Sequence, residues 1–357
     1  MSLIYDQRNK CCFCECNKFT ELLQNDVLIS PSLNLYEQKS ERNLIPYNIV
    51  ECNKCKVSLI KYLANIDIVY QKNHIDGYGE VKSEKHKKIT NFILKNKEIN
   101  SITEIGAAEG VLANSIIEKK NINYKIIEPN YIGKKHKNLN VIKKFFEETN
   151  NEEIMSDCLI MSDVFEHFYN PLEILKKISE TGFKYVILNH PDFDHAIENN
   201  HCVILNIEHT FQIEHQFLFK LFNNFGYSLN RNYNFNNFSL FLEFKKEENL
   251  PLVELENINT PKNIRNYIKN LVNLTKNMEI YISNNRNKKY FIWPCSAHST
   301  TLFVFGIEGY NLLCSSFNEK IKSGNQEDVI IISGAFAYIK ELDLKTSIEI
   351  KFLEDFL

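Results

Sequence analysis

The stretch ITEIGAAEG, residues 102–110, decides the fold of this chain. We expect a strand that ends near Glu104, followed by a turn bracketed by Gly106 and Gly110 and a helix that begins near Val111. Glycine in such a turn lets the backbone approach a bound ligand closely. The turn lacks the Gly-x-Gly-x-x-Gly pattern of a pyrophosphate-binding loop, so it favours a ligand without a diphosphate.

The segments around this turn alternate between short apolar runs and helical patterns. Expected strands cover residues 99–106, 124–130, 157–167 and 183–191, and expected helices cover 111–120 and 171–180. A late strand over 237–244 should lie at the edge of the sheet. Strand–helix alternation with apolar strands predicts an α/β fold with a Rossmann-like, doubly wound core.

Acidic residues and a histidine follow successive strands of this predicted sheet. Glu128 ends the strand after Glu104 and is placed to hold both hydroxyls of a ribose. Asp163, Glu166 and His167 follow the next buried strand. Each carboxylate could equally be a solvated loop residue if taken singly, but together they indicate a nucleoside site. Residues 145–147 (Phe-Phe-Glu) border the adenine in this reading, although core packing explains the aromatic pair equally well.

Six of the ten cysteines lie near the N-terminus. Cys11 with Cys14, and Cys52 with Cys55, form two Cys-x-x-Cys pairs that can close on one Zn²⁺. Four thiolates leave no open coordination position, so we expect a structural zinc site. Cys12 and Cys16 are surplus in this arrangement. A Cys14/Cys16 register and a set of unpaired thiols are the alternatives.

Length and composition favour a multidomain protein. The chain has 357 residues, 44% hydrophobic and 24% charged, with a net charge of −3. We expect a zinc-binding module over residues 1–70, a core domain over 71–250 and a C-terminal α/β domain over 251–357. The low net charge and the absence of long apolar runs predict no nucleic-acid partner and no membrane span. Abundant cysteine without a signal-peptide pattern favours a cytoplasmic location.

The C-terminal third reads as a smaller α/β unit. An acidic stretch with two prolines at 247–261 marks the boundary. A helix over 261–284 and strands within 288–299, 309–316 and 328–336 follow. Ser296, His298 and Ser299 could reach a substrate phosphate at a helix N-terminus or could simply cap that helix.

These motifs resemble the class I S-adenosylmethionine-dependent methyltransferases, and more narrowly the zinc-containing nucleotide-sugar C-methyltransferase family. The four cysteines match that family's pairs, and Glu128 with Pro129 matches its Glu-Pro. Its Tyr-x-Glu-His motif is echoed by FQIEHQF, where Gln212 replaces the tyrosine. The resemblance implies methyl transfer from S-adenosylmethionine to a carbon beside a ketone of a nucleotide-linked sugar.

The resemblance also implies roles for individual residues. The expected base is His215, with Glu214 either orienting it or taking the base role itself, and His167 stabilises the developing oxyanion or binds the acceptor. The expected cofactor-binding residues are Glu104, Gly106, Ala107, Gly110, Glu128 and Asp163. The expected substrate-binding residues are Tyr78, His190 and His298. A hydroxyl or amine acceptor, and a non-catalytic zinc-containing scaffold, are the competing interpretations.

Overall fold

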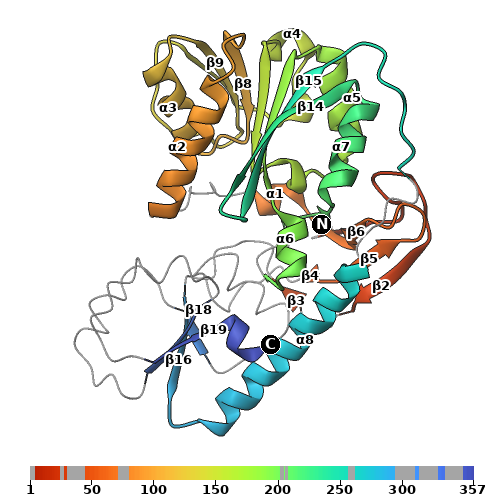
Figure 1. The fold of residues 1–357 in the computed structure, drawn as a ribbon, viewed down its shortest axis with the longest axis vertical. Coiled ribbons are helices and arrows are strands. Elements are labelled where there is room, and N and C mark those ends of the chain that lie inside the picture. Colours follow the sequence, from red (N-terminus) through yellow and green to blue (C-terminus); the bar gives the residue numbers. More distant parts are fainter. Residues whose placement is uncertain are drawn as a thin grey trace.

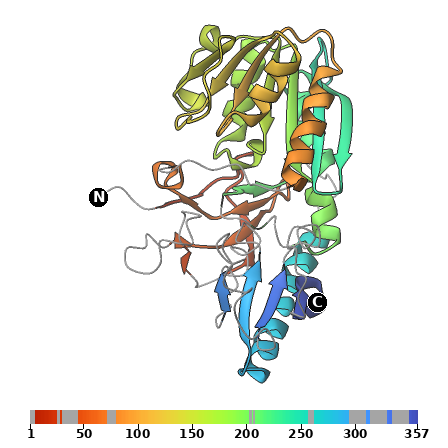
Figure 2. The same ribbon diagram turned by 90° about the vertical axis from the view of Figure 1, so that its left-hand side faces the viewer.

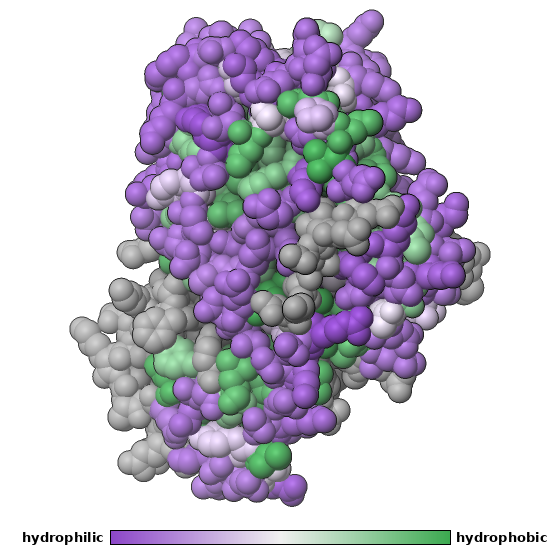
Figure 3. All heavy atoms as spheres, turned by 45° about the vertical axis from the view of Figure 1, so that its right-hand side comes forward, coloured by the Kyte–Doolittle hydropathy of each residue, from purple (hydrophilic) through white to green (hydrophobic). Residues whose placement is uncertain are grey.

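The computed structural model describes residues 5–24, 28–29, 45–70, 80–201, 205, 208–255, 262–293, 310–312, 329–333 and 349–357. A large sheet with its helices occupies one end of the molecule, the C-terminal unit occupies the other, and the N-terminal module lies between them (Figures 1 and 2). Hydrophilic residues cover most of the face drawn in Figure 3. Within the described ranges, no helix is long and apolar enough to cross a bilayer.

A seven-stranded sheet in the order β10-β9-β8-β11-β12-β15-β14 forms the core domain. Its strands are β8 (Ser101–Ile105), β9 (Asn123–Ile127), β10 (Leu139–Ile142), β11 (Cys158–Ser162), β12 (Tyr185–Pro191), β14 (Tyr227–Phe235) and β15 (Ser239–Lys246). The strands from β10 to β12 pair in parallel, whereas β15 and β14 are antiparallel. This arrangement confirms the predicted α/β, doubly wound core.

Helices cover both faces of this sheet. On one face lie α2 (Glu80–Leu94) and α3 (Val111–Lys119), and on the other lie α4 (Asn151–Ile154), α5 (Pro171–Thr181) and α7 (His215–Asn224) (Figure 1). The 3₁₀ turns η1 (Phe146–Glu148) and η2 (Phe165–His167) connect strands to helices. Helix α5 has Pro171 in its first turn and ends at Gly182 in the left-handed conformation, as its sequence signals predict.

The expected edge position of the late strand was wrong. That strand is β15, which lies inside the sheet between β12 and β14 and is buried from Ser239 to Phe244. The edge is β14, whose polar sequence gave no clear strand signal. A buried carboxylate inside β15, that of Glu243, is satisfied by Arg231 and Asn230 of β14. The edge strand is therefore fixed by a charge pair that hydrophobic patterning does not reveal.

The N-terminal module is built from short strands. They are β1 (Tyr5–Gln7), β2 (Phe19–Leu23), β3 (Leu28–Ile29), β4 (Ile45–Pro46), β5 (Ile49–Cys52), β6 (Ser58–Ile60) and β7 (Tyr62–Ala64), and the helix α1 (Ile66–Val69) follows. One sheet has the order β13-β6-β5-β2, and its first strand, β13 (Phe211–Gln212), comes from the core domain.

The C-terminal unit combines one long helix with a parallel sheet. Helix α8 (Lys262–Asn284) precedes a sheet in the order β17-β16-β18-β19. Its strands are β16 (Lys289–Trp293), β17 (Tyr310–Leu312), β18 (Val329–Ser333) and β19 (Glu349–Phe352), and η5 (Leu353–Phe356) ends the chain. The helix packs on α6 (Phe193–Glu198), and its Arg265 pairs with Glu51 of β5 at 3.0 Å.

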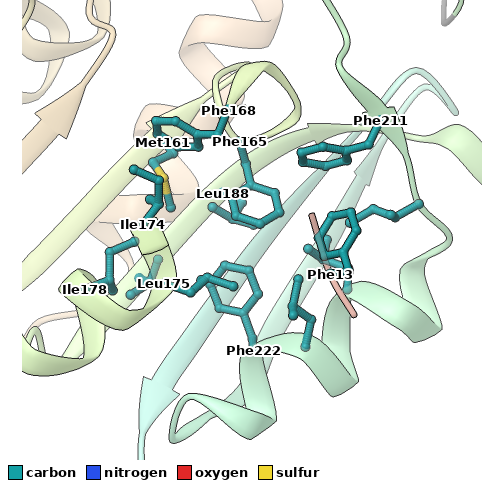
Figure 4. Close-up of a cluster of buried hydrophobic side chains, with 14 of the residues drawn as sticks. Phe13, Met161, Phe165, Phe168, Ile174, Leu175, Ile178, Leu188, Phe211 and Phe222 are labelled. Carbon is teal, nitrogen blue, oxygen red and sulfur yellow. The ribbon is translucent and has the colours of Figure 1, made fainter. Parts of the chain in front are cut away.

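A continuous apolar core joins the N-terminal module to the large sheet. Phe13 lies between two of the clustered cysteines. Its ring centroid is 4.9 Å from that of Phe211 and 5.2 Å from that of Phe217. Phe165 of η2 contacts Phe211 at 5.7 Å (Figure 4). The module is therefore packed into the core and does not hang from a linker.

Replacing Arg231 by methionine should destabilise the protein by about 3 kcal/mol, because it leaves the buried Glu243 carboxylate without its cation. Urea unfolding measures the change. Lys184→Met removes an exposed partner of Glu98 and should have a much smaller effect. Equal stability of Arg231→Met and the wild type would contradict the role of this pair.

Candidate functional site

A cavity of about 310 Å³ lies at the carboxyl ends of the parallel strands. The large sheet contributes Gly106, Glu128 and Asp163 to its walls, and the N-terminal module contributes Ile66 and Tyr70. A second cavity of about 130 Å³ shares Gly106 and Asp163 with the first. Ligands of open α/β sheets bind at this edge, so the two cavities form the candidate site.

The glycine turn shapes the wall of both cavities. Gly106 has φ +69°, and a Cβ there would lie 2.6 Å from Cγ2 of Val164. Gly110 has φ +73° and precedes α3. Ala107 between them is buried. Both glycines therefore meet a conformational demand that a larger residue would strain.

Glu128 faces the larger cavity from the end of β9. Its carboxylate accepts hydrogen bonds from the backbone N–H groups of Asn130, at 3.0 Å, and Ala108, at 3.4 Å. Burial raises its pKa above the usual value. Glu104 is placed differently, because its buried carboxylate accepts from the Tyr124 hydroxyl at 2.8 Å and borders the smaller cavity only. Of the two acids at the strand ends, Glu128 is the one exposed to a ligand in the larger cavity.

Residues 145–147 also line the larger cavity. The ring of Phe145 lies 6.3 Å from that of Tyr70, edge to face. Phe146 is in addition buried in the core, under the ammonium of Lys177. The aromatic pair therefore lines the larger cavity, and Phe146 also packs in the core.

Asp163 stands between the two cavities in a left-handed conformation, φ +54°. Lys85 of α2 donates to both carboxylate oxygens, at 3.0 and 2.8 Å, and Asn189 donates to one at 3.0 Å. Burial alone would raise the pKa of Asp163, but Lys85 and Lys82 outweigh it and lower the pKa to about 2. This carboxylate is therefore a fixed negative charge at neutral pH.

His167 of η2 lines the larger cavity beside a buried acid. Its Nδ1 lies 3.4 Å from the Tyr70 hydroxyl and 3.7 Å from Oε2 of Glu208. Burial raises the pKa of Glu208 to about 8. The ring of His209 lies 5.1 Å from that of His167. An imidazole, a phenol and an acid that titrates near neutral pH thus meet at one wall of the cavity.

The structure places Glu214 and His215 outside this cavity. Nδ1 of His215 lies 2.9 Å from Asp194, and its Nε2 lies 3.4 Å from Asp192. Glu214 precedes α7 and borders a small recess next to Ile264 of α8, where burial raises its pKa to about 7. His215 is therefore paired with two aspartates, and neither Glu214 nor His215 lines the larger cavity.

An identical Glu-His dipeptide lies six residues earlier, and its glutamate, Glu208, lines the cavity. The residue after this dipeptide, Thr210, donates its N–H to the Glu166 carbonyl at 3.0 Å and its hydroxyl to the Phe168 carbonyl at 2.6 Å. These bonds fix Glu208 and His209 against η2. The repeated dipeptide was the available signal, but sequence alone did not distinguish the two copies.

The predicted substrate-binding residues have different outcomes. His190 is fully buried, its Nδ1 lies 2.9 Å from the Pro191 carbonyl, and burial lowers its pKa to about 3. It lines neither cavity. Tyr78 and His298, like residues 296 and 299, lie outside the described residues. Tyr70 and Tyr169, which the sequence analysis did not single out, are tyrosines that line the larger cavity.

The four predicted metal ligands converge in the N-terminal module. The Sγ atoms of Cys11 and Cys55 lie 3.5 Å apart, as do those of Cys14 and Cys52, and all four lie within 4.8 Å of one another. The thiol of Cys16 instead bonds to the backbone of residue 18. Four convergent thiols fit a closed, tetrahedral Zn²⁺ site, and this geometry excludes the Cys14/Cys16 register.

No protein-family model and no curated protein matches the sequence. Parts of solved structures are similar to it. A candidate O-methyltransferase from Nostoc punctiforme is 12% identical, with a TM-score of 0.37 over 46% of this chain and 57% of its own. The plantazolicin methyltransferase BpumL is 11% identical, with a TM-score of 0.39, and the match covers 47% of this chain and 85% of BpumL. The N-methyltransferase NodS from Bradyrhizobium japonicum is 11% identical, with a TM-score of 0.38, and the match covers 52% of this chain and 94% of NodS. The match spans little more than half of the Nostoc protein, so functional assignment rests on the site itself.

Replacing Cys55 by serine should lower the zinc bound per chain by about one ion, because it removes one of four convergent thiolates. Elemental analysis of the purified protein measures the zinc content. Cys16→Ser is the matched control and should leave it unchanged. Equal zinc losses in both variants would contradict the assigned ligand set.

Proposed function

We propose that the protein is an S-adenosylmethionine-dependent methyltransferase that methylates a carbon beside a ketone of a nucleotide-linked sugar. The observation that carries the proposal is one cavity with two chemically different walls. One wall holds the glycine turn and the Glu128 carboxylate, which suit a nucleoside. The other holds His167 and Glu208, which suit proton removal.

The donor's adenosine fits the wall formed by β8 and β9. Glu128 lines the cavity and accepts hydrogen bonds from the two ribose hydroxyls in this proposal, since a carboxylate has lone pairs beyond those that bond Asn130 and Ala108. Phe145 offers an aromatic surface to the adenine. The amino-acid end extends toward the smaller cavity, where Asp163 meets its ammonium group and Lys82 its carboxylate.

Glu208 acts as the general base in this proposal. Its carboxylate takes a proton from the carbon beside the ketone, and the electron pair of that C–H bond forms an enolate. His167 donates a hydrogen bond to the enolate oxygen. The carbon then attacks the donor's methyl group in line as the carbon–sulfur bond breaks, which leaves S-adenosylhomocysteine. An acid with a pKa of about 8 is a better base for this step than an ordinary carboxylate.

The four-cysteine site has a structural role in this proposal. A bound Zn²⁺ would make rigid the turn from Cys11 to Cys14, which carries Phe13 into the core. The same module supplies Tyr70 to the cavity, with its hydroxyl 3.4 Å from His167. The thiolate cluster thus acts on the reaction only through the position of the cavity wall.

Glu128→Gln should weaken S-adenosylmethionine binding by roughly tenfold, because an amide cannot accept from both ribose hydroxyls as a carboxylate does. Calorimetry on the zinc-loaded protein measures the dissociation constant. Glu118→Gln, on the exposed face of α3, is the control. If the wild-type protein binds no S-adenosylmethionine, the proposed function is wrong.

Glu208→Gln should abolish exchange of the hydrogen beside the ketone when a nucleotide-linked keto-deoxysugar is incubated in deuterated water with S-adenosylhomocysteine. The wild-type rate should rise about tenfold per pH unit and level off above pH about 8, because the base acts only when deprotonated. Nuclear magnetic resonance follows the exchange.

Glu214→Gln decides between the two Glu-His dipeptides in the same assay. Loss of exchange in Glu214→Gln with exchange kept in Glu208→Gln would restore the pair chosen from sequence. No exchange in the wild type, despite donor binding, would count against a carbon acceptor.

A further inference from the structure

Glu166 is a buried acid that the proposed reaction does not use. Its side chain is 0% exposed, and neither carboxylate oxygen has a hydrogen-bond partner among the described residues. Burial raises its pKa well above the usual value. A raised pKa accounts for a loss of charge, but a neutral carboxylic acid still needs an acceptor for its proton and a donor to its carbonyl oxygen. Protonation alone therefore does not explain why both oxygens of Glu166 lack a hydrogen-bond partner.

Two imidazoles converge on this carboxylate. Donor atoms of Glu166, His167 and His209 all lie within 4.8 Å of one another. The convergence is built by tertiary contacts, because the Thr210 N–H bonds the Glu166 carbonyl and brings residues 208–209 beside η2. Three donors from two separate segments thus surround one point, which a chance surface cluster of acids would not achieve.

The two nitrogens of His167 face different partners. Nε2 lies 3.9 Å from Oε1 of Glu166, whereas Nδ1 lies 3.7 Å from Oε2 of Glu208. A metal-bound histidine has this arrangement, in which one nitrogen coordinates the ion and the other donates to a carboxylate. Glu208 would then orient His167, and Glu166 would share the metal with it.

We propose that Glu166, His167 and His209 bind a divalent first-row transition-metal ion, at a site separate from the four cysteines. Two imidazole nitrogens and one carboxylate oxygen suit Zn²⁺, Co²⁺ or Mn²⁺, whereas Mg²⁺ and Ca²⁺ prefer oxygen donors alone. With Glu208 included, two carboxylates and two neutral imidazoles balance the charge of a divalent ion. Three protein ligands leave a coordination position open.

The consequence for the reaction rests on the proposed function, although the metal site itself does not. A metal on Nε2 fixes His167 in the tautomer that carries its proton on Nδ1, the nitrogen near Tyr70 and Glu208. Coordination also makes that N–H a stronger donor to an enolate oxygen. The ion would thus act through His167.

The test counts metal ions in the full-length protein. After saturation with Zn²⁺ and dialysis, elemental analysis should find about two ions per chain in the wild type and about one in Glu166→Gln and His209→Asn. Glu118→Gln and His136→Asn make the same chemical changes at exposed positions and should keep both ions. Circular dichroism and thermal melting verify that each variant is folded. Equal zinc content in the wild type and a folded Glu166→Gln would overturn the proposal.

Cobalt identifies the ligands. In protein loaded with Co²⁺, the spectrum of the wild type minus that of Glu166→Gln should contain ligand-field bands without the thiolate-to-cobalt charge transfer of the cysteine site. A difference spectrum dominated by charge transfer would place the second ion on cysteine and contradict the assignment. Calorimetry with S-adenosylmethionine is independent: a protein that binds the second metal but no donor refutes the proposed function and keeps this site.

Discussion

The packing of Phe13 against the core of the large sheet is the interaction on which the candidate site depends. This ring sits between Cys11 and Cys14, is almost fully buried and meets Phe211 and Phe217 edge to face. Burying one phenylalanine contributes about 1.5–3 kcal/mol. Phe165 of η2 packs on the same Phe211. One core is therefore shared by the turn from Cys11 to Cys14, by β13 and by η2, which carries His167. The cysteine cluster is thereby linked to the cavity without touching it.

This shared core explains how three distant segments of chain form one cavity wall. Strand β13 pairs with β6 of the N-terminal module, and Thr210, just before β13, bonds to Glu166 and Phe168. The module in turn leads into α1 and Tyr70, whose hydroxyl meets His167. The pairing of β13 from the core domain with β6 from the N-terminal module therefore brings a phenol, an imidazole and two acids together. A core domain without the module would lack one side of this wall.

The sequence predicted the features that depend on local order and missed those that depend on tertiary contacts. Alternating apolar runs predicted β8, β9, β11, β12 and β15 together with α3 and α5, and spacing predicted the four convergent cysteines. Strand β14 was missed because its partner contact is the ion pair of Arg231 with a buried Glu243, not an apolar stripe. The second Glu-His dipeptide was chosen because the two copies look alike in sequence, and only the contacts of Thr210 with η2 bring Glu208 of the first copy to the cavity.

The carboxyl groups of the site differ widely in pKa although they lie close together. Asp163 is held by Lys85 and has a pKa of about 2, whereas burial gives Glu208 a pKa of about 8. Glu166 lies beside them with a raised pKa and unpartnered oxygens. Carboxyl groups with divergent environments mark divided roles in acid–base chemistry. Lys85 of α2 satisfies Asp163, whereas neither oxygen of Glu166 has a hydrogen-bond partner among the described residues, and a buried acid without partners costs stability that a purely structural region would not need to lose. The divergent environments of these acids around His167 are the physical reason to study this wall of the cavity first.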